Sequence, residues 1–353
     1  MGQVTYDVAV VGAGIMGAST ASHLAAAGRS VVVLERFEVG HRRGSSHGSS
    51  RIFRLSYPDA AYVDMAQESL SLWRAFEEQE GEQLVTTTGG LDLGVALDRH
   101  ASALARCGVV HEVATPDEAA RRWPFLQLGA AERVLFQPAA GFVAAAAAWS
   151  AFARAAARAG ADLRERMPVS GLAPRSGGVE LATPAGSVRA RAAVVTAGSW
   201  ARDLLAPVGL ELPTTTTRET VAYFGRAGPA LPSIVDWEDP AVYALEAPGL
   251  GGGVKVGLHH AGPVTDPDAS GAPDPVVVDR LASWVSHRLP GVDPHPVGAE
   301  TCLYTNAPEE RFILERRGSI VVGSACSGHG FKFAPLIGAR VAALAHEALE
   351  ANA

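Results

Sequence analysis

The chain has 353 residues, of which 48% are hydrophobic and 19% are charged, a balance typical of a soluble globular enzyme and not of a disordered or fibrous chain. Its formal net charge of −7 argues against binding to nucleic acid or to an anionic membrane. Three cysteines are too few for a disulfide framework, which favours a reducing, cytoplasmic compartment.

A glycine motif near the N-terminus stands between the elements that it requires. The valine-rich run 6–11 predicts a buried parallel strand, which enters the motif Gly-Ala-Gly-Ile-Met-Gly at 12–17. Helical character follows over 18–27, and a second buried strand over 30–34 ends at Glu35. This short segment therefore contains a strand, a glycine motif, a helix and a second strand that ends in an acidic residue. That order of elements predicts a dinucleotide-binding unit.

The glycines and the terminal acid of that unit each have a physical role. Gly12 permits a tight turn, Gly14 lets the backbone approach a pyrophosphate, and Gly17 allows the helix to pack closely on the strand. The N-terminus of the helix would face the phosphates, and Glu35 would accept hydrogen bonds from a ribose. The motif alone does not distinguish NAD from FAD.

A loop of small residues follows at 44–54, with Ser45 and Ser50 among its hydroxyl groups. Glycine and serine make a loop that can lie against a flat ligand or a phosphate. Arg51 and Arg54 are three residues apart and would share one face of a helix or turn. Because they flank two apolar residues, a solvated basic loop is a less natural interpretation for this pair.

The alanine-rich stretch 142–161 predicts one helix packed by small side chains. Its apolar part is too short to span a bilayer, and the N-terminus lacks the pattern of a signal peptide. We therefore expect no membrane association.

Only two of the 30 basic residues are lysines, namely Lys255 and Lys332. A codon bias against lysine would explain the arginines. Both lysines, however, lie in glycine-rich, apolar surroundings and not on charged helix faces. Lysine offers a compact ammonium group whose pKa can move toward neutrality, which arginine does not, so a functional role is favoured for both.

Five motifs occur in one order and together resemble the monomeric sarcosine oxidase and N-methyltryptophan oxidase family of flavin amine oxidases. The resemblance extends over essentially the whole chain and is far more specific than any one motif. The motifs are the glycine fingerprint at 12–17, Gly-Ser-Ser-His-Gly-Ser-Ser-Arg-Ile-Phe-Arg at 44–54, Gly-Val-Lys-Val-Gly-Leu-His at 253–259, Thr-Cys-Leu-Tyr-Thr at 301–305 and Ser-Gly-His-Gly-Phe-Lys at 327–332.

The resemblance implies an FAD cofactor joined covalently through Cys302. Without the resemblance, a lone cysteine is usually a small buried hydrophobic residue. The residues expected to contact the cofactor are Gly12, Gly14, Gly17, Glu35, Ser45, Ser50, Arg51, Cys302, Gly328, Gly330 and Lys332.

The resemblance also implies a division of the catalytic work. Lys255 matches a lysine that promotes the reaction of the reduced flavin with O2, where a cation stabilises developing negative charge. Arg54 and Lys332 match a pair of cations that binds the substrate carboxylate. Arg51 matches an arginine that tunes the electrostatics of the flavin.

Three further residues complete the expected site. His259 matches an active-site histidine, and Tyr304 matches a tyrosine of the substrate pocket. Tyr243 is a second candidate for the pocket wall. We expect no metal site, because no His/Cys cluster in the sequence has ligand spacing.

The implied fold is α/β, with a Rossmann-like FAD-binding domain and a substrate domain built on an antiparallel sheet. We predict that the FAD domain comprises residues 1–86, 141–213 and 300–353, and the substrate domain residues 87–140 and 214–299. The strands predicted for the substrate sheet are 221–224, 241–245 and 253–258.

The implied function is that of a flavin-dependent oxidase acting on a secondary amine with a carboxylate: sarcosine, another N-methyl amino acid or a cyclic imino acid. The C–N bond becomes an imine, and O2 becomes hydrogen peroxide. Three alternatives stay open: an FAD-dependent dehydrogenase with another electron acceptor, a tailoring oxidase in specialised-metabolite biosynthesis, and a nucleotide-binding protein without chemistry. We expect a monomer whose partners are the small substrate and O2.

Overall fold

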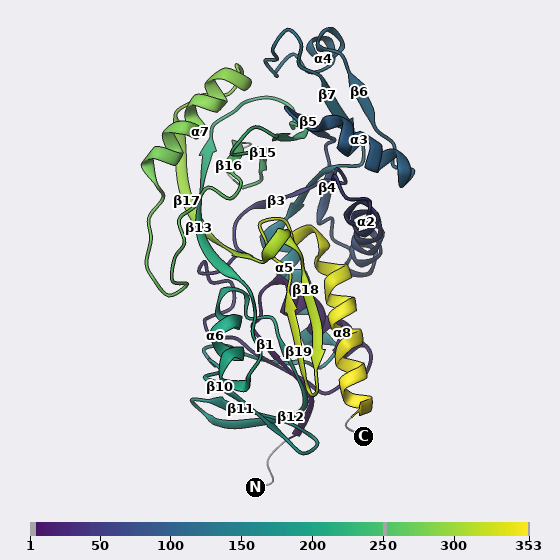
Figure 1. Cartoon of the computed structure of the whole chain (residues 1–353), viewed down its shortest axis with the longest axis vertical. Coiled ribbons are helices and arrows are strands. Elements are labelled where there is room, and N and C mark those ends of the chain that lie inside the picture. The colour runs from purple at the N-terminus through teal and green to yellow at the C-terminus, as the bar shows by residue number, and fades with distance from the viewer. Residues whose placement is uncertain (1–4, 250–252, 352–353) are drawn as a thin grey trace.

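The structure, a computed structural model, describes residues 5–249 and 253–351. The outer ends of the predicted ranges 1–86 and 300–353 therefore lie outside the described residues. The molecule is elongated, with one sheet and most long helices in its lower half and a second sheet above them (Figure 1). Both ends of the chain lie at the lower end (Figure 1).

The first sheet is built around the predicted N-terminal strand β1, which pairs in parallel with the second predicted strand β2 and with β12. β19 and β9 extend the parallel part beside β12 and β2, and the antiparallel strands β10, β11 and β18 complete the sheet. Valine and alanine fill the parallel strands, as burial on both faces requires. The strands are β1 (Thr5–Val11), β2 (Val31–Leu34), β9 (Asp162–Arg164), β10 (Gly171–Arg175), β11 (Gly178–Thr183), β12 (Gly186–Val195), β18 (Ile313–Arg317) and β19 (Ile320–Ser324).

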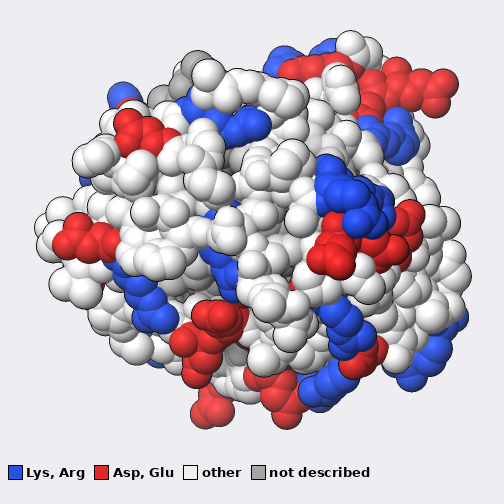
Figure 2. Space-filling view, turned by 90° about the horizontal axis from the view of Figure 1, so that it is seen from above, with Lys and Arg blue, Asp and Glu red and all other residues white. Residues whose placement is uncertain are grey.

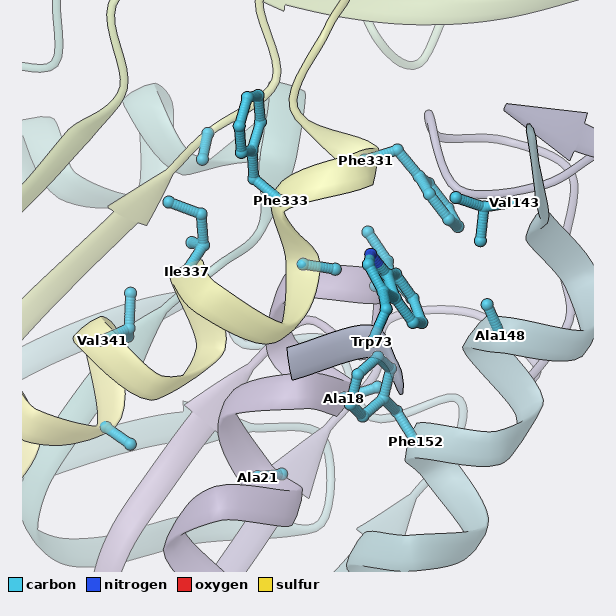
Figure 3. Packing of buried hydrophobic residues seen from close by; sticks show 14 of the residues in the cluster. Ala18, Ala21, Trp73, Val143, Ala148, Phe152, Phe331, Phe333, Ile337 and Val341 are labelled. Atoms are coloured by element: carbon cyan, nitrogen blue, oxygen red, sulfur yellow. The ribbon is translucent and has the colours of Figure 1, made fainter. Parts of the chain in front are cut away.

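Long helices cover this sheet, and small residues let them approach one another. Ala18 and Ala21 of the first helix lie in the same buried cluster as Phe152 and Ile337 from two other helices (Figure 3). Gly17 serves a different contact, between the first helix and the turn that precedes it. A methyl group on Gly17 would collide with the carbonyl oxygen of Gly12, so the helix can lie this close to the turn only with glycine at position 17. The helices are α1 (Ile15–Ala26), α2 (Ala60–Glu80), α5 (Ala145–Arg158), α6 (Ala201–Leu205) and α8 (Ala334–Ala351).

The second sheet runs in the order β17-β13-β16-β15-β14-β5-β7-β6. β5 and β14 pair in parallel, whereas the other neighbours along this order are antiparallel. The strands are β5 (Gly90–Leu93), β6 (Glu112–Ala114), β7 (Val134–Gln137), β13 (Thr215–Phe224), β14 (Ser233–Asp236), β15 (Val242–Ala247), β16 (Gly253–Leu258) and β17 (Pro296–Asn306). The helices of this half are α3 (Leu97–Arg106), α4 (Pro116–Arg122) and α7 (Pro275–Arg288).

A small third sheet joins the two halves and corrects two predictions. It consists of β3 (Ser50–Phe53), β8 (Gly141–Ala144) and β4 (Val85–Thr87). The helix predicted over 142–161 was therefore wrong at its start, because Phe142 and Val143 pair with both neighbouring strands. Arg51 lies within the strand β3. It therefore does not lie in a helix or turn, the arrangement in which Arg51 and Arg54 would share one face.

The three strands predicted for the substrate sheet are confirmed as parts of β13, β15 and β16. β17 crosses the predicted boundary at residue 300 and pairs with β13 along both sides of it. The division into two domains stays a prediction. Among the described residues, no helix is both long and apolar enough to cross a bilayer.

Candidate active site

One large cavity, with a volume of about 960 Å³, is lined by residues of both main sheets and of the loops between them. Its size is that of a site for a large organic ligand. Of the residues predicted from the sequence, Gly17 lies outside the cavity and supports the turn from behind. The others line it: Gly12, Gly14, Glu35, Ser45, Ser50, Arg51, Arg54, Tyr243, Lys255, His259, Cys302, Tyr304, Gly328, Gly330 and Lys332.

The nucleotide-binding end is formed where β1 meets α1. Gly12 has a φ of +93°, and a methyl group there would lie 2.9 Å from the carbonyl oxygen of Thr196. The backbone N–H of Ala13 donates to Glu35 Oε2 at 2.7 Å. Burial opposes ionisation of Glu35, but hydrogen bonds from His41 and the backbone outweigh it and keep the carboxyl pKa below its usual value. Glu35 thus enters the cavity as a carboxylate that also holds the turn.

The loop at 44–54 is held in place by Arg51. Its guanidinium donates to the carbonyl oxygens of Ser45 at 2.7 Å, His47 at 2.6 Å and Ser50 at 2.9 Å. The hydroxyl of Ser50 donates to the carbonyl oxygen of Glu246 at 2.6 Å, which ties the loop to the second sheet. The predicted cofactor loop is therefore a wall of the cavity, and the charge of Arg51 is held in it by these hydrogen bonds.

Lys255 is 3% exposed and lies on β16. Burial and the charge of Arg51 lower the pKa of its ammonium group to about 7, against the opposing effect of Glu300. Glu300 accepts hydrogen bonds from Tyr223 and Arg42, which hold its carboxylate near Lys255. Lys255 is thus a buried amine that changes its charge near neutral pH.

Cys302 lies on β17 with its side chain in the cavity wall. Burial raises the pKa of its thiol, whereas Arg51 and Lys255 act in the opposite direction. Cys326 lines the same cavity and accepts the backbone N–H of Thr305 at 3.4 Å. This position of Cys326 was not predicted.

Two cations of the cavity wall meet around Tyr57. The guanidinium carbon of Arg54 lies 4.0 Å from the centre of the Tyr57 ring, and Lys332 Nζ lies 5.5 Å from it. The Lys332 ammonium donates to the Tyr57 hydroxyl at 2.9 Å and to the carbonyl oxygen of His329 at 2.6 Å. Burial and Arg54 lower the pKa of Lys332 well below its usual value. A carboxylate between the two cations would relieve this repulsion.

Two phenols and a histidine form the wall beside these cations. Burial raises the pKa values of Tyr243 and Tyr304, so both stay protonated donors. The ring of His259 lies 5.9 Å from that of Tyr304, and burial lowers the pKa of this histidine. A methyl group on Gly328 would lie 2.7 Å from His259 Cε1, and one on Gly330 would overlap the carbonyl oxygen of Ala325. Neither position therefore has room for a side chain.

Several residues that line or support the cavity were not predicted. Tyr57 links the two cations, Glu300 lies near Lys255, and Trp237 stacks against Arg54 with its ring centre 4.9 Å from the guanidinium carbon. Tyr57 lies three residues after Arg54, and that proximity was the available signal. Glu300 directly precedes the motif at 301–305, which was a similar signal. Trp237 carries none, because only the fold brings it to the cavity.

The pKa of Lys255 makes the stability of the protein depend on pH. Between the folded value of about 7 and the usual value of 10.5, the unfolded chain binds a proton that the folded protein releases. The free energy of unfolding should therefore rise with pH across this window, by up to about 1.4 kcal/mol per pH unit from this group. Lys255→Met removes that contribution, so urea unfolding at a series of pH values should show wild type gaining stability relative to the variant as pH rises. Parallel pH profiles would contradict the assignment.

Comparison with known proteins places the chain among flavoenzymes. The sequence model of the family of FAD dependent oxidoreductases (DAO) matches residues 7–344. The chain is 36% identical to the peroxisomal sarcosine oxidase of Homo sapiens, over 94% of this chain and 90% of that protein. It is 34% identical to the monomeric sarcosine oxidase of Streptomyces avermitilis, over 97% and 94% of the two chains.

The solved structure of NikD in its open form, an amino acid oxidase essential for nikkomycin biosynthesis, has a TM-score of 0.89 to this protein. The match has 31% identity and covers 97% of this chain and 94% of that one. An L-proline dehydrogenase from P. horikoshii has a TM-score of 0.86 at 22% identity, a likeness of fold.

Proposed function

Because the chain belongs to the family of FAD-dependent oxidoreductases, we propose that it oxidises the C–N bond of a secondary amino acid to an imine and reduces O2 to hydrogen peroxide. The substrate class comprises sarcosine, other N-methyl amino acids and cyclic imino acids. One observation carries the proposal: Arg54 and Lys332, which flank Tyr57, line the same cavity as the glycines of the dinucleotide fingerprint.

The residues of the cavity fit FAD. The turn at Gly12 leaves no room for a side chain, and the carboxylate of Glu35 faces the nucleotide end. The N–H of Ile15, at the start of α1, donates to Ser46 Oγ at 3.0 Å. The N-terminus of this helix thus has an N–H directed at a hydrogen-bond acceptor, as the binding of a phosphate group also requires. FAD supplies a two-electron acceptor when bound, and Gly12, Gly14, Glu35, Ser45 and Ser50 would hold it.

The substrate-binding residues orient the amine by its acid group. A carboxylate between Arg54 and Lys332 would accept charge-assisted hydrogen bonds in a buried, low-dielectric setting, where such bonds are strong. Tyr243, Tyr304 and His259 then close the wall around the amine. The neutral side chain of His259 at physiological pH suits a substrate that reacts as the free amine. Lys255 would place a positive charge where O2 gains electrons.

We further propose that FAD is attached covalently to Cys302, which lies in the cavity wall beside Arg51 and Lys255. Acid precipitation of the purified protein should give a yellow pellet, and the Cys302→Ser variant should leave the yellow colour in the supernatant. The Cys326→Ser variant is the matched control, because that thiol lines the same cavity and should not affect the linkage. A colourless wild-type pellet would exclude the attachment.

A tailoring oxidase in specialised biosynthesis is the second candidate, favoured by the structural likeness to NikD. A dehydrogenase with another acceptor is less well supported, since Lys255 lies buried in the cavity where it would serve O2. We also propose that the protein acts as a cytoplasmic monomer.

A screen for peroxide release tests the proposed function. Sarcosine, N-methyl-L-tryptophan, L-proline and L-pipecolate would each be supplied in air to the purified protein, with the corresponding primary amino acids as controls. At least one secondary amino acid should release peroxide in proportion to oxygen consumed. Reduction of an artificial dye without any peroxide would support the dehydrogenase instead.

A further inference from the structure

Three side chains with metal-binding atoms meet beside the substrate end of the cavity. Glu310 Oε1 lies 3.1 Å from His260 Nε2, and Glu310 Oε2 lies 3.8 Å from His259 Nε2. One ligand atom from each of the three residues lies within 4.8 Å of the other two. We propose that His259, His260 and Glu310 form a binding site for a divalent transition metal, with Zn²⁺ as the best fit.

The spacing suits zinc. Bonds of about 2.0–2.2 Å in a tetrahedral site place neighbouring ligand atoms roughly 3.3–3.6 Å apart. The two histidine–glutamate distances, 3.1 Å to Oε1 and 3.8 Å to Oε2, lie on either side of this range, and the three ligand atoms lie within 4.8 Å of one another. Side-chain rotations that draw these atoms together would close the site. Two imidazole nitrogens and one carboxylate favour zinc over magnesium or calcium, which prefer all-oxygen sites. Three protein ligands leave a fourth position for water or another ligand.

The three ligands are open to solvent. The side chains of His259, His260 and Glu310 are 20%, 27% and 51% exposed, so an ion reaches them from solvent.

The backbone holds the ligands in place. His260 and Glu310 have φ values of +56° and +55°, a left-handed conformation that residues with a side chain rarely adopt. The N–H of His259 bonds to the carbonyl oxygen of Ala241 at 2.8 Å, and the carbonyl oxygen of Glu310 lies 3.0 Å from His329 Nε2. Both turns are therefore fixed before any ion binds, which lowers the cost of assembling the site.

A metal at this position would inhibit the enzyme, a consequence that rests on the proposed function. His259 lines the cavity, and the rings of His259 and His260 lie 5.9 and 5.5 Å from the Tyr304 ring. A bound ion would occupy Nε2 of His259, a residue of the cavity wall, and would narrow the pocket. Because Arg54 acts on His259 and Lys332 on Glu310 with positive charge, we expect a dissociation constant on the order of micromolar.

Calorimetric titration of the EDTA-treated holoprotein with Zn²⁺ tests the site without relying on activity. Wild type should bind one equivalent, and Glu310→Gln and His260→Asn should each weaken binding by roughly tenfold or more. Asparagine tolerates the left-handed backbone at 260, which protects the fold of that variant. His295→Ala is the matched control: His295 forms an exposed pair with Asp293 at 2.8 Å and should not contribute. Mg²⁺ should not bind at the same concentrations.

Equal zinc binding by wild type and both ligand variants would overturn the proposal, as would no wild-type binding at about 100 μM Zn²⁺. In the peroxide assay, Zn²⁺ should raise KM for the amino acid in wild type and not in Glu310→Gln, and EDTA should reverse the effect. Zinc binding with an unchanged KM would remove the inhibitory role. Zinc binding in a protein that oxidises no secondary amino acid would refute the proposed function and leave the metal site standing.

Discussion

Replacing Lys255 by methionine is expected to slow the reaction of the reduced enzyme with O2 by about a hundredfold or more, with a much smaller effect on flavin reduction by substrate. The ammonium group is buried beside the proposed flavin site and has a pKa of about 7, so it supplies positive charge within a low-dielectric wall. Methionine keeps the volume and apolar packing of the side chain and removes the charge. Stopped-flow absorbance measures the two half-reactions separately.

The reductive half-reaction is the internal control, because a misfolded cavity would slow both. A second control is Arg42→Met, which removes an exposed cation that pairs with Glu300 on the far side of the same cluster. That variant should keep most of its reactivity with O2. Equal losses in both half-reactions of Lys255→Met would contradict the assignment of this lysine to O2.

Loss of Lys332 should abolish most of the affinity for the substrate carboxylate. Removing one partner of a buried, hydrogen-bonded charge pair costs about 2–5 kcal/mol, which corresponds to roughly a thirtyfold to several thousandfold fall in kcat/KM. Lys332 is 1% exposed, and its ammonium already lies beside Tyr57 and Arg54, where the carboxylate would bind. Steady-state kinetics of Lys332→Met with the preferred amino acid measures the fall.

A substrate analogue in which the carboxylate is replaced by a neutral amide separates binding from folding. It should be a poor substrate of wild type and should lose little further activity in Lys332→Met. A simple carboxylate such as acetate should perturb the flavin spectrum of wild type and not of the variant. If the variant loses acid and amide substrates equally, Lys332 supports the fold and does not bind the carboxylate.

The charge pattern on the surface agrees with a small-molecule enzyme. On the face seen from above, basic and acidic side chains are interspersed, with no broad field of one sign (Figure 2). The cations proposed to act in catalysis are instead inside, since Lys255, Lys332 and Arg54 are all less than 9% exposed. The net charge of the chain therefore describes its surface, whereas the proposed chemistry would use three buried cations.

The parts of the fold that depend on local pattern were predictable. Valine-rich runs predicted β1 and β2. The glycine turn between β1 and α1 was also predictable, because it follows from steric limits that act within a few residues. The error at 142–161 arose because alanine-rich composition extended the helix over Phe142 and Val143, which instead pair with strands from distant segments. Pairing of that kind depends on tertiary contacts and leaves no local trace.

The candidate site followed from the resemblance more than from the residues taken singly. Lys255, Cys302 and Lys332 lie on the cavity as the motifs indicated, although their chemical roles stay proposals. The cluster of His259, His260 and Glu310 was missed, and no metal site was expected. Adjacent histidines do not have ligand spacing in sequence, and Glu310 reaches them only through the turn after β17.

The most direct test of the account is an anaerobic titration of the holoenzyme with a secondary amino acid, followed by exposure to air. The account predicts loss of the oxidised flavin absorbance by one equivalent of substrate, and rapid recovery in air with one equivalent of hydrogen peroxide. Unchanged absorbance with every secondary amino acid, at concentrations that saturate the carboxylate site, would contradict it.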